Sequence, residues 1–150
     1  MKKEFQIFNE FITGKRLRHT AQREKIMDIF LSTGMHLSCE QLYELVKKKY
    51  PGIGYTTVYR TMKLLCESGL CEEIDIGDGV VRFEHKYGRL HHDHLVCTKC
   101  GKLIEVNNPE IERLQEAMAK KNKFVPTAHK LEIFGICREC SYRNKKATAR

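Results

Sequence analysis

The sequence predicts an α+β fold made of two units, a larger helical unit followed by a smaller unit that combines strands with one helix. Three observations lead to this prediction. Apolar residues recur at helical spacing as far as residue 69, and the period changes to two between residues 70 and 85. Two Cys-x-x-Cys pairs follow, at 97–100 and 137–140. A chain of 150 residues is long enough for two small domains.

Two helices are expected before residue 35. The first places apolar side chains at positions i, i+3 and i+7 between residues 5 and 12, and it ends at Gly14. The second begins after Thr20, whose hydroxyl can cap a helix N-terminus, and it is closed by Gly34. The second helix carries Ile26, Ile29 and Phe30 on one face.

Two further helices are expected before residue 70. Ser38 begins the third, and Gln41 follows three residues later, as in a capping box. The segment Tyr-Pro-Gly at 50–52 stops this helix. The fourth helix begins near Thr56 and ends at Gly69.

A β-hairpin is expected after the fourth helix. Residues 70–76 and 80–85 alternate in polarity, and Gly-Asp-Gly at 77–79 separates them. Compact helices followed by a two-stranded hairpin are typical of a winged helix-turn-helix, in which the last helix enters the major groove of DNA.

The fourth helix has a polar outer face that suits DNA. Its positions outside the core include Tyr55, Thr56, Thr57, Tyr59, Arg60 and Lys63. Hydroxyl and guanidinium groups are the ones that contact phosphates and base edges. The segment 15–25 carries five basic residues and one acid, while 54–65 has no acid. The alternative interpretation is a solvated face on an ordinary helical bundle.

The second unit is expected to be small. A linker at 86–90 leads to strands at 94–97 and 102–106, which flank a Cys-x-x-Cys-Gly turn. Asn108-Pro109 begins a helix with N-cap and proline in the preferred order. We expect this helix to bury the stripe Ile111, Leu114 and Met118. A third strand is expected over 124–137, and the last ten residues are expected to be a disordered basic tail. About fifty residues fold poorly alone, so a metal, a partner chain or both are needed.

The composition excludes membrane and secreted classes. The net charge of +8 and the 41% hydrophobic content indicate a folded protein rather than a disordered one. No segment approaches the roughly 18 apolar residues of a membrane span. Gln6, Asn9 and Glu10 interrupt any signal-peptide core. We therefore expect a cytoplasmic protein with no membrane contact, and in the cytosol paired cysteines more often hold metal than form disulfides.

Four cysteines have the spacing of a zinc site. The pairs Cys97–Cys100 and Cys137–Cys140 each place two thiolates at a turn, and two such pairs complete a tetrahedral site. All four positions are filled by protein, so the site is expected to be structural. The alternative is reduced thiol pairs or disulfides.

The run His-His-Asp-His at 91–94 is a second set of metal ligands. In an extended segment His92 and His94 share one face, whereas His91 and Asp93 share the other, so the run can serve two sites. Mixed imidazole and carboxylate ligands suit Fe(II), Mn(II), Zn(II) or Co(II). Candidate partners elsewhere are His36, Glu84, Glu105, Glu112 and His129. A histidine cluster on the surface without a specific metal is the alternative.

Two segments resemble one known family. Thr-Val-Tyr-Arg-Thr at 57–61 and His-His-Asp-His-Leu-Val-Cys-x-x-Cys-Gly at 91–101 are similar, in the same order, to the ferric uptake regulator family of bacterial metal-dependent repressors. The resemblance implies a winged-helix DNA-binding domain at 1–85, a hinge linker at 86–90, and a metal-binding dimerisation domain at 91–150 that ends in a basic tail.

The resemblance also implies roles for individual residues. The regulatory metal site at the hinge would consist of His36, Glu84, His92 and His94, with Glu105 as a further ligand. An additional site in the dimerisation domain would consist of His91, Asp93, Glu112 and His129. The structural zinc would be held by Cys97, Cys100, Cys137 and Cys140. Tyr59 and Arg60 would lie near DNA in the recognition helix, and Arg18 would approach the minor groove.

These roles predict an Fe(II)-dependent repressor of iron-uptake genes, with Mn(II) or Zn(II) as substitute metals. It would bind a pseudo-palindromic double-stranded operator as a homodimer, with a tetramer as the alternative assembly. Peroxide-sensing members typically have Asp at the positions of Glu84 and Glu105, so Glu84 favours iron. A zinc-uptake or peroxide-sensing regulator is the alternative. In that alternative, Cys39 or Cys71 could supply a thiolate ligand to the regulatory site. We otherwise interpret Cys39, Cys66 and Cys71 as small buried residues.

Two other classes are weighed against this prediction, a constitutive zinc-stabilised DNA-binding protein and a zinc enzyme. The chain has no His-Glu-x-x-His helix, and we find no nucleophile–base pair. We therefore expect no enzymatic activity and no small-molecule substrate.

Overall fold

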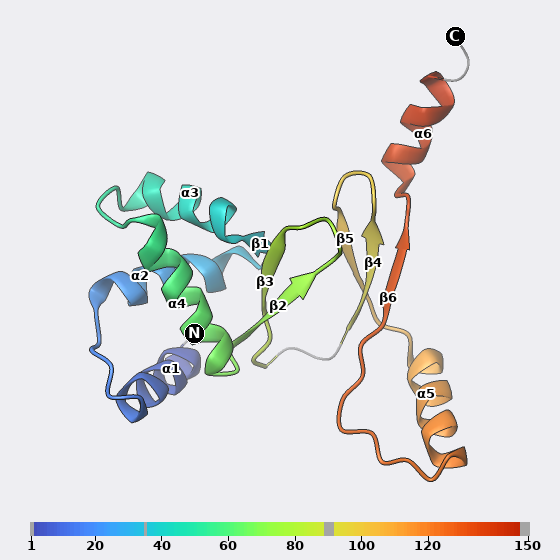
Figure 1. Ribbon diagram of the computed structural model, residues 1–150, viewed down its shortest axis with the longest axis horizontal. Coiled ribbons are helices and arrows are strands. Elements are labelled where there is room, and N and C mark those ends of the chain that lie inside the picture. The colour runs from blue at the N-terminus through green and yellow to red at the C-terminus, as the bar shows by residue number, and fades with distance from the viewer. Residues whose placement is uncertain (1, 35, 89–91, 148–150) are drawn as a thin grey trace. The chain divides into compact units, whose positions relative to one another are not determined.

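The computed structural model of the chain describes residues 2–34, 36–88 and 92–147, with residues 143–147 described by their backbone alone. The chain divides into two compact units, Met1–Arg89 and Leu90–Arg150 (Figure 1). No helix in the described ranges is long and apolar enough to cross a bilayer. Helices and small sheets occur in both units, which confirms the predicted α+β class.

The first unit is a winged helix. Its elements are α1 (Lys2–Gly14), α2 (Ala21–Thr33), β1 (Leu37–Ser38), α3 (Cys39–Lys49), α4 (Tyr55–Glu67), β2 (Cys71–Asp75) and β3 (Val81–His85). The helices gather beside an antiparallel sheet with the strand order β1-β3-β2 (Figure 1). Strands β2 and β3 form the wing.

The helix boundaries follow the local capping signals. The Thr20 side chain accepts a hydrogen bond from the backbone N–H of Arg23, and Gly34 closes α2 in the left-handed conformation at φ 59°. Ser38 and Gln41 form both hydrogen bonds of a capping box. These capping predictions are confirmed because each depends only on residues within one turn of the helix end.

The wing turn is held by two aspartates. The Asp75 carboxylate accepts from the Gly77 N–H at 2.8 Å. Asp78 accepts two hydrogen bonds from the Arg82 guanidinium, at 3.0 and 2.7 Å. This contact holds the pKa of the Asp78 carboxyl below its usual range. Gly77 and Gly79 adopt φ near +78°, which favours glycine. The hairpin is therefore as predicted, with slightly shorter strands.

Strand β1 is absent from the sequence prediction. It has two residues, and it pairs antiparallel with β3 so that Leu37 lies opposite Phe83 and Ser38 opposite Arg82. A segment this short has no period to detect, and Ser38 by itself signals only a helix cap. The pairing has a functional consequence, because the same register places His36 next to Glu84.

The core of the first unit lies under α4. Val58, Met62 and Leu65 are fully buried on the inner face of this helix. They meet Ile26, Met27, Phe30, Leu42 and Val46 from α2 and α3. Because the inner face is anchored in this way, the opposite face of α4 has a fixed orientation toward solvent.

The second unit has a small mixed sheet. Its elements are β4 (Asp93–Cys97), β5 (Leu103–Val106), α5 (Pro109–Lys121), β6 (Glu132–Gly135) and α6 (Arg138–Ala147). The strand order is β5-β4-β6, with β4 antiparallel to β5 and parallel to β6. The Asn108 side chain caps α5 and Pro109 occupies its first turn, as predicted.

Three expectations for this unit are wrong. Leu114 and Met118 of the predicted buried stripe are 67% and 64% exposed, because none of the described residues of this unit covers that face of α5. The third strand covers only Glu132–Gly135 instead of 124–137, since its neighbour β4 offers just five residues for pairing. The basic tail expected to be disordered is helical as far as Ala147, because the Cys137–Cys140 turn continues directly into α6.

Candidate metal centres and DNA-contact surface

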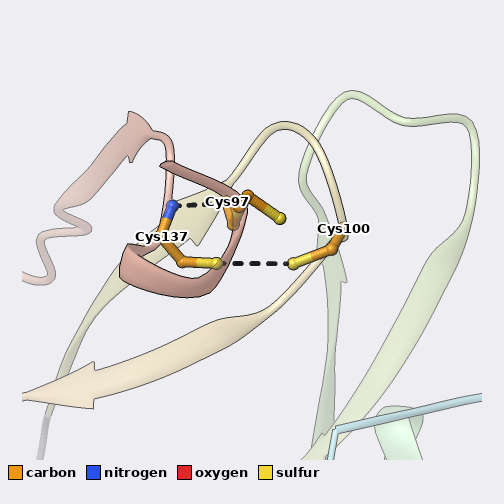
Figure 2. Close-up of side chains that lie close together, drawn as sticks. Cys97, Cys100 and Cys137 are labelled. Carbon is orange, nitrogen blue, oxygen red and sulfur yellow. Dashed lines mark hydrogen bonds between the residues drawn. The ribbon is translucent and has the colours of Figure 1, made fainter. Parts of the chain in front are cut away.

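The four paired cysteines lie together in the second unit. Cys97 ends β4 and Cys100 lies in the following turn. Cys137 lies between β6 and α6, and Cys140 lies in the first turn of α6. Their sulfur atoms all lie within 4.8 Å of one another. The parallel pairing of β4 with β6 brings Cys97 opposite Gly135 and so joins the two Cys-x-x-Cys turns (Figure 2).

The sulfur spacing fits tetrahedral zinc. The Sγ atoms of Cys100 and Cys137 are 3.7 Å apart (Figure 2). A tetrahedral ion with Zn–S bonds of about 2.3 Å requires about 3.8 Å between its ligands. Four thiolates leave no open position for water or substrate, so this chemistry is that of a structural ion.

The local backbone favours the thiolate form at this site. The N–H of Cys137 donates to Cys97 Sγ at 3.3 Å. This hydrogen bond lowers the pKa of Cys97 to about 6, and hydrogen bonds from the N–H groups of Cys100 and Lys99 make smaller contributions in the same direction. Beside the site, Lys102 Nζ lies 2.7 Å from Glu139 Oε1 and lowers the pKa of that carboxyl to about 2. This ion pair ties the start of β5 to α6.

The first unit holds a buried histidine–carboxylate pair. His36 Nε2 lies 3.3 Å from Glu84 Oε1, and the side chains are 12% and 3% exposed. The pair exists because β1 and β3 are antiparallel neighbours, which sets the residue before Leu37 next to the residue after Phe83. An imidazole and a buried carboxylate at this distance are two ready ligands for a divalent cation.

The second unit holds two histidines and a carboxylate around the start of β4. The rings of His92 and His94 have centroids 5.0 Å apart. Glu105 lies opposite His94 in the β4–β5 register, and its Oε1 is 4.0 Å from His92 Nε2. We call His92, His94 and Glu105 the β4 ligand group.

A third group lies elsewhere in the second unit. Asp93, Glu112 and His129 each offer an atom within 4.8 Å of the others. His129 Nε2 lies 3.2 Å from Glu112 Oε2. The fourth residue expected here, His91, lies outside the described residues. Asp93 is adjacent to His94 on β4, so their side chains leave the strand on opposite sides.

The outer face of α4 carries the expected DNA-contact residues. Tyr55, Tyr59 and Arg60 are exposed on this face, whereas Thr57 is half-buried. Arg18 is exposed in the loop before α2. The aromatic and guanidinium groups of α4 therefore point away from the core, as a recognition helix requires.

Two carboxylates on this surface were not expected from the sequence. The Tyr55 hydroxyl donates to Glu40 Oε1 at 2.9 Å, which raises the pKa of Tyr55. Lys63 Nζ donates to Glu73 Oε1 at 2.6 Å, which raises the pKa of Lys63. No local pattern in the sequence indicates either contact, because each joins α4 to a different element.

The comparisons with known proteins decide the family. The profile of the ferric uptake regulator family matches residues 14–134. The ferric uptake regulation protein of Bacillus subtilis (strain 168) is 42% identical over 125 residues, which cover 81% of this chain and 84% of that protein. The chain belongs to the ferric uptake regulator family. Membership makes it a metal-dependent transcriptional regulator, and it confirms the resemblance of the two motifs.

Relatives outside Bacillus match over still more of the chain. The ferric uptake regulation protein of Campylobacter jejuni is 36% identical over 142 residues, or 93% of this chain and 88% of that protein. Among solved structures, the Helicobacter pylori ferric uptake regulator, described as having three functional metal-binding sites, superimposes with a TM-score of 0.87. It is 28% identical and covers 93% of each chain.

Proposed function

We propose that this chain is an Fe(II)-dependent repressor of iron-uptake genes, acting in the cytoplasm as a homodimer on a pseudo-palindromic operator. One observation limits the choice of metal. His36 with Glu84, and His92 with His94 and Glu105, offer only nitrogen and oxygen ligands. Such sets suit Fe(II), as well as Mn(II), Zn(II) and Co(II). Among these metals, the ferric uptake names of the relatives favour iron.

We assign the regulatory site to ligands from both units. His36 and Glu84 come from the first unit, and the β4 ligand group comes from the second. A bound divalent cation supplies the positive charge that offsets the carboxylates of Glu84 and Glu105. If both units contribute ligands to one ion, as proposed, metal binding would shift the population toward the arrangement of the units that brings all the ligands together. The shift is limited by the difference in metal affinity between the arrangements.

The other two groups have separate roles in this proposal. The four cysteines hold a structural Zn(II), and Asp93, Glu112 and His129, with His91, form an additional metal site. Leu114 and Met118 on α5, with Phe124 and Val125 after it, are exposed apolar side chains that a second copy of the chain would cover. Dimerisation would then position two α4 helices for successive major grooves, about 34 Å apart.

Titration of metal against operator affinity tests the function. We expect apo protein with intact structural zinc to bind the operator weakly, and Fe(II) to strengthen binding, with Mn(II) as a substitute. Equal affinity with and without added metal would exclude a regulator and favour a constitutive DNA-binding protein. A response to Zn(II) at far lower free concentration than to Fe(II) would favour a zinc-uptake regulator. Loss of binding when the Fe(II) form meets hydrogen peroxide would favour a peroxide sensor.

Replacing Arg60 by Ala is expected to weaken operator binding. Arg60 is exposed on the outer face of α4, so the change removes a cation without opening a cavity in the core. We expect the Fe(II)-loaded protein to lose about 10-fold in operator affinity. If Arg60 contacts a phosphate, the slope of log affinity against log salt concentration should also fall by about one unit. Fluorescence anisotropy at several salt concentrations measures both. Lys48→Ala, which removes an exposed cation from the end of α3, is the matched control, and equal losses in both variants would contradict the assigned contact.

A further inference from the structure

Two cysteines outside the metal groups lie in contact in the first unit. Cys66 is in the last turn of α4, and Cys71 is the first residue of β2. Their Sγ atoms are 2.8 Å apart. Non-bonded carbon atoms pack best at about 3.5–4.0 Å, and a disulfide bond requires about 2.05 Å between its sulfurs. The two sulfurs must therefore approach by less than about 1 Å to become bonded.

We propose that Cys66 and Cys71 form an oxidisable dithiol that closes to an intramolecular disulfide in the presence of a hydroperoxide, and so links the recognition helix covalently to the wing. The turn between them favours this closure. Gly69 adopts φ +77°, which reverses the chain directly after α4, and the N–H of Leu70 donates to Leu65 O at 3.1 Å. The backbone thus holds both thiols in place before any reaction.

The two thiols have different roles in the reaction. Cys66 is half-buried, while Cys71 is 3% exposed. The hydrogen bond with Cys66 and burial both raise the pKa of Cys71, so it stays protonated and is reached last by an oxidant. Cys66 is therefore the thiol that meets the hydroperoxide, and Cys71 is the resolving thiol.

The chemistry balances with hydrogen peroxide as oxidant. The Cys66 sulfur attacks one peroxide oxygen and the O–O bond breaks. The departing hydroxide takes the thiol proton, so one water and a sulfenic acid form. The Cys71 sulfur then attacks the sulfenic sulfur, the S–O bond breaks, and its proton leaves with the hydroxyl as a second water. In total two thiols lose two hydrogen atoms, and one hydrogen peroxide is reduced to two waters.

The disulfide would stabilise the first unit. It closes a ring that includes the end of α4 and the start of β2, and so restricts the unfolded chain. The outer face of α4 carries Tyr59 and Arg60, and β2 is half of the wing. The link therefore fixes the end of the recognition helix relative to the wing.

Peptide mapping tests the proposal on the full-length, zinc-loaded protein without iron. Trypsin releases residues 64–82, which contain Cys66 and Cys71 and no other cysteine. After treatment with equimolar hydrogen peroxide and then iodoacetamide, we expect this peptide to lack both alkyl groups and to weigh about 2 Da less than the reduced peptide. Cleavage after Glu67 should leave two fragments joined until dithiothreitol is added. The peptide with Cys39, residues 26–47, is the internal control and should stay fully alkylated.

In the variant Cys66→Ser, peroxide should no longer protect Cys71 from alkylation. In Cys39→Ser the disulfide between Cys66 and Cys71 should still form. Oxidised wild-type protein should melt about 5 °C higher than reduced protein, and Cys66→Ser should show no such rise. Two alkyl groups on residues 64–82 after peroxide would overturn the proposal. Sulfinic acid at Cys66 with an alkylated Cys71 would overturn it as well, and a disulfide without a rise in melting temperature would contradict the stabilising link.

Discussion

Replacing Cys100 by Ser is expected to remove the structural zinc and, with it, the folded second unit. A serine hydroxyl is a poor zinc ligand, and the remaining three cysteines leave the site open to water. The described residues of this unit include few buried ones, namely Val96 and Cys97 with Asp93 and His94. Structural zinc contributes about 10–16 kcal/mol in small zinc-dependent folds, which is more than so small a core can replace.

Metal content and assembly state measure this effect. We expect less than one zinc ion per chain and loss of the dimer in sedimentation velocity. We also expect the far-UV circular dichroism signal of the second unit to be lost. Lys99→Ala lies in the same turn and keeps all four cysteines, so it should retain both zinc and the dimer. Cys100 is the most exposed of the four cysteines, so its change creates no cavity, and any collapse reflects the lost ligand. A zinc-loaded, dimeric Cys100→Ser protein would show that the cysteine group is not the structural site.

Local signals in the sequence predict most elements of this fold. The caps at Thr20, Ser38 and Asn108 depend on hydrogen bonds within one helical turn, and each is present as expected. Strand β1 has no such signal, because its identity comes only from its pairing with β3. The stripe on α5 is apolar as predicted but not buried, because none of the described residues covers Leu114 and Met118.

The candidate sites show the same difference between features that follow from local spacing and contacts that depend on strand pairing. The spacing within each Cys-x-x-Cys pair predicts two ligands at a turn, and the structure brings the two pairs together through β4 and β6. The contact between His36 and Glu84 spans 48 positions and depends on the β1 register, so no local spacing predicts it. Ligand chemistry made both residues candidates, and the family resemblance assigned them to one site. Neither spacing nor resemblance indicated that Glu73 holds Lys63, because this contact joins α4 to the wing.

Replacing Glu84 by Gln is expected to abolish the response to Fe(II) while the protein stays folded. The glutamine amide keeps the size of the side chain and one oxygen, but it removes the negative charge beside His36. Loss of an anionic ligand weakens the attraction for a divalent cation, and even changes in residues that only support ligands typically cost about 10–100-fold in metal affinity. We therefore expect at least about a 10-fold rise in the Fe(II) concentration for half-maximal operator binding.

The chain offers a matched control for this experiment. Glu72 lies opposite Glu84 in the β2–β3 register, but its side chain is half-exposed and forms an ion pair with Lys86 at 2.6 Å. Such surface pairs contribute little to stability, so Glu72→Gln should keep the normal Fe(II) response. Zinc content of Glu84→Gln should stay at the wild-type level, because the four cysteines lie in the other unit. A melting temperature close to wild type is the check that the protein stays folded. If Glu84→Gln responds to Fe(II) at the wild-type concentration, His36 and Glu84 form a structural pair, and the regulatory ligands must be sought among Asp93, Glu112 and His129 instead.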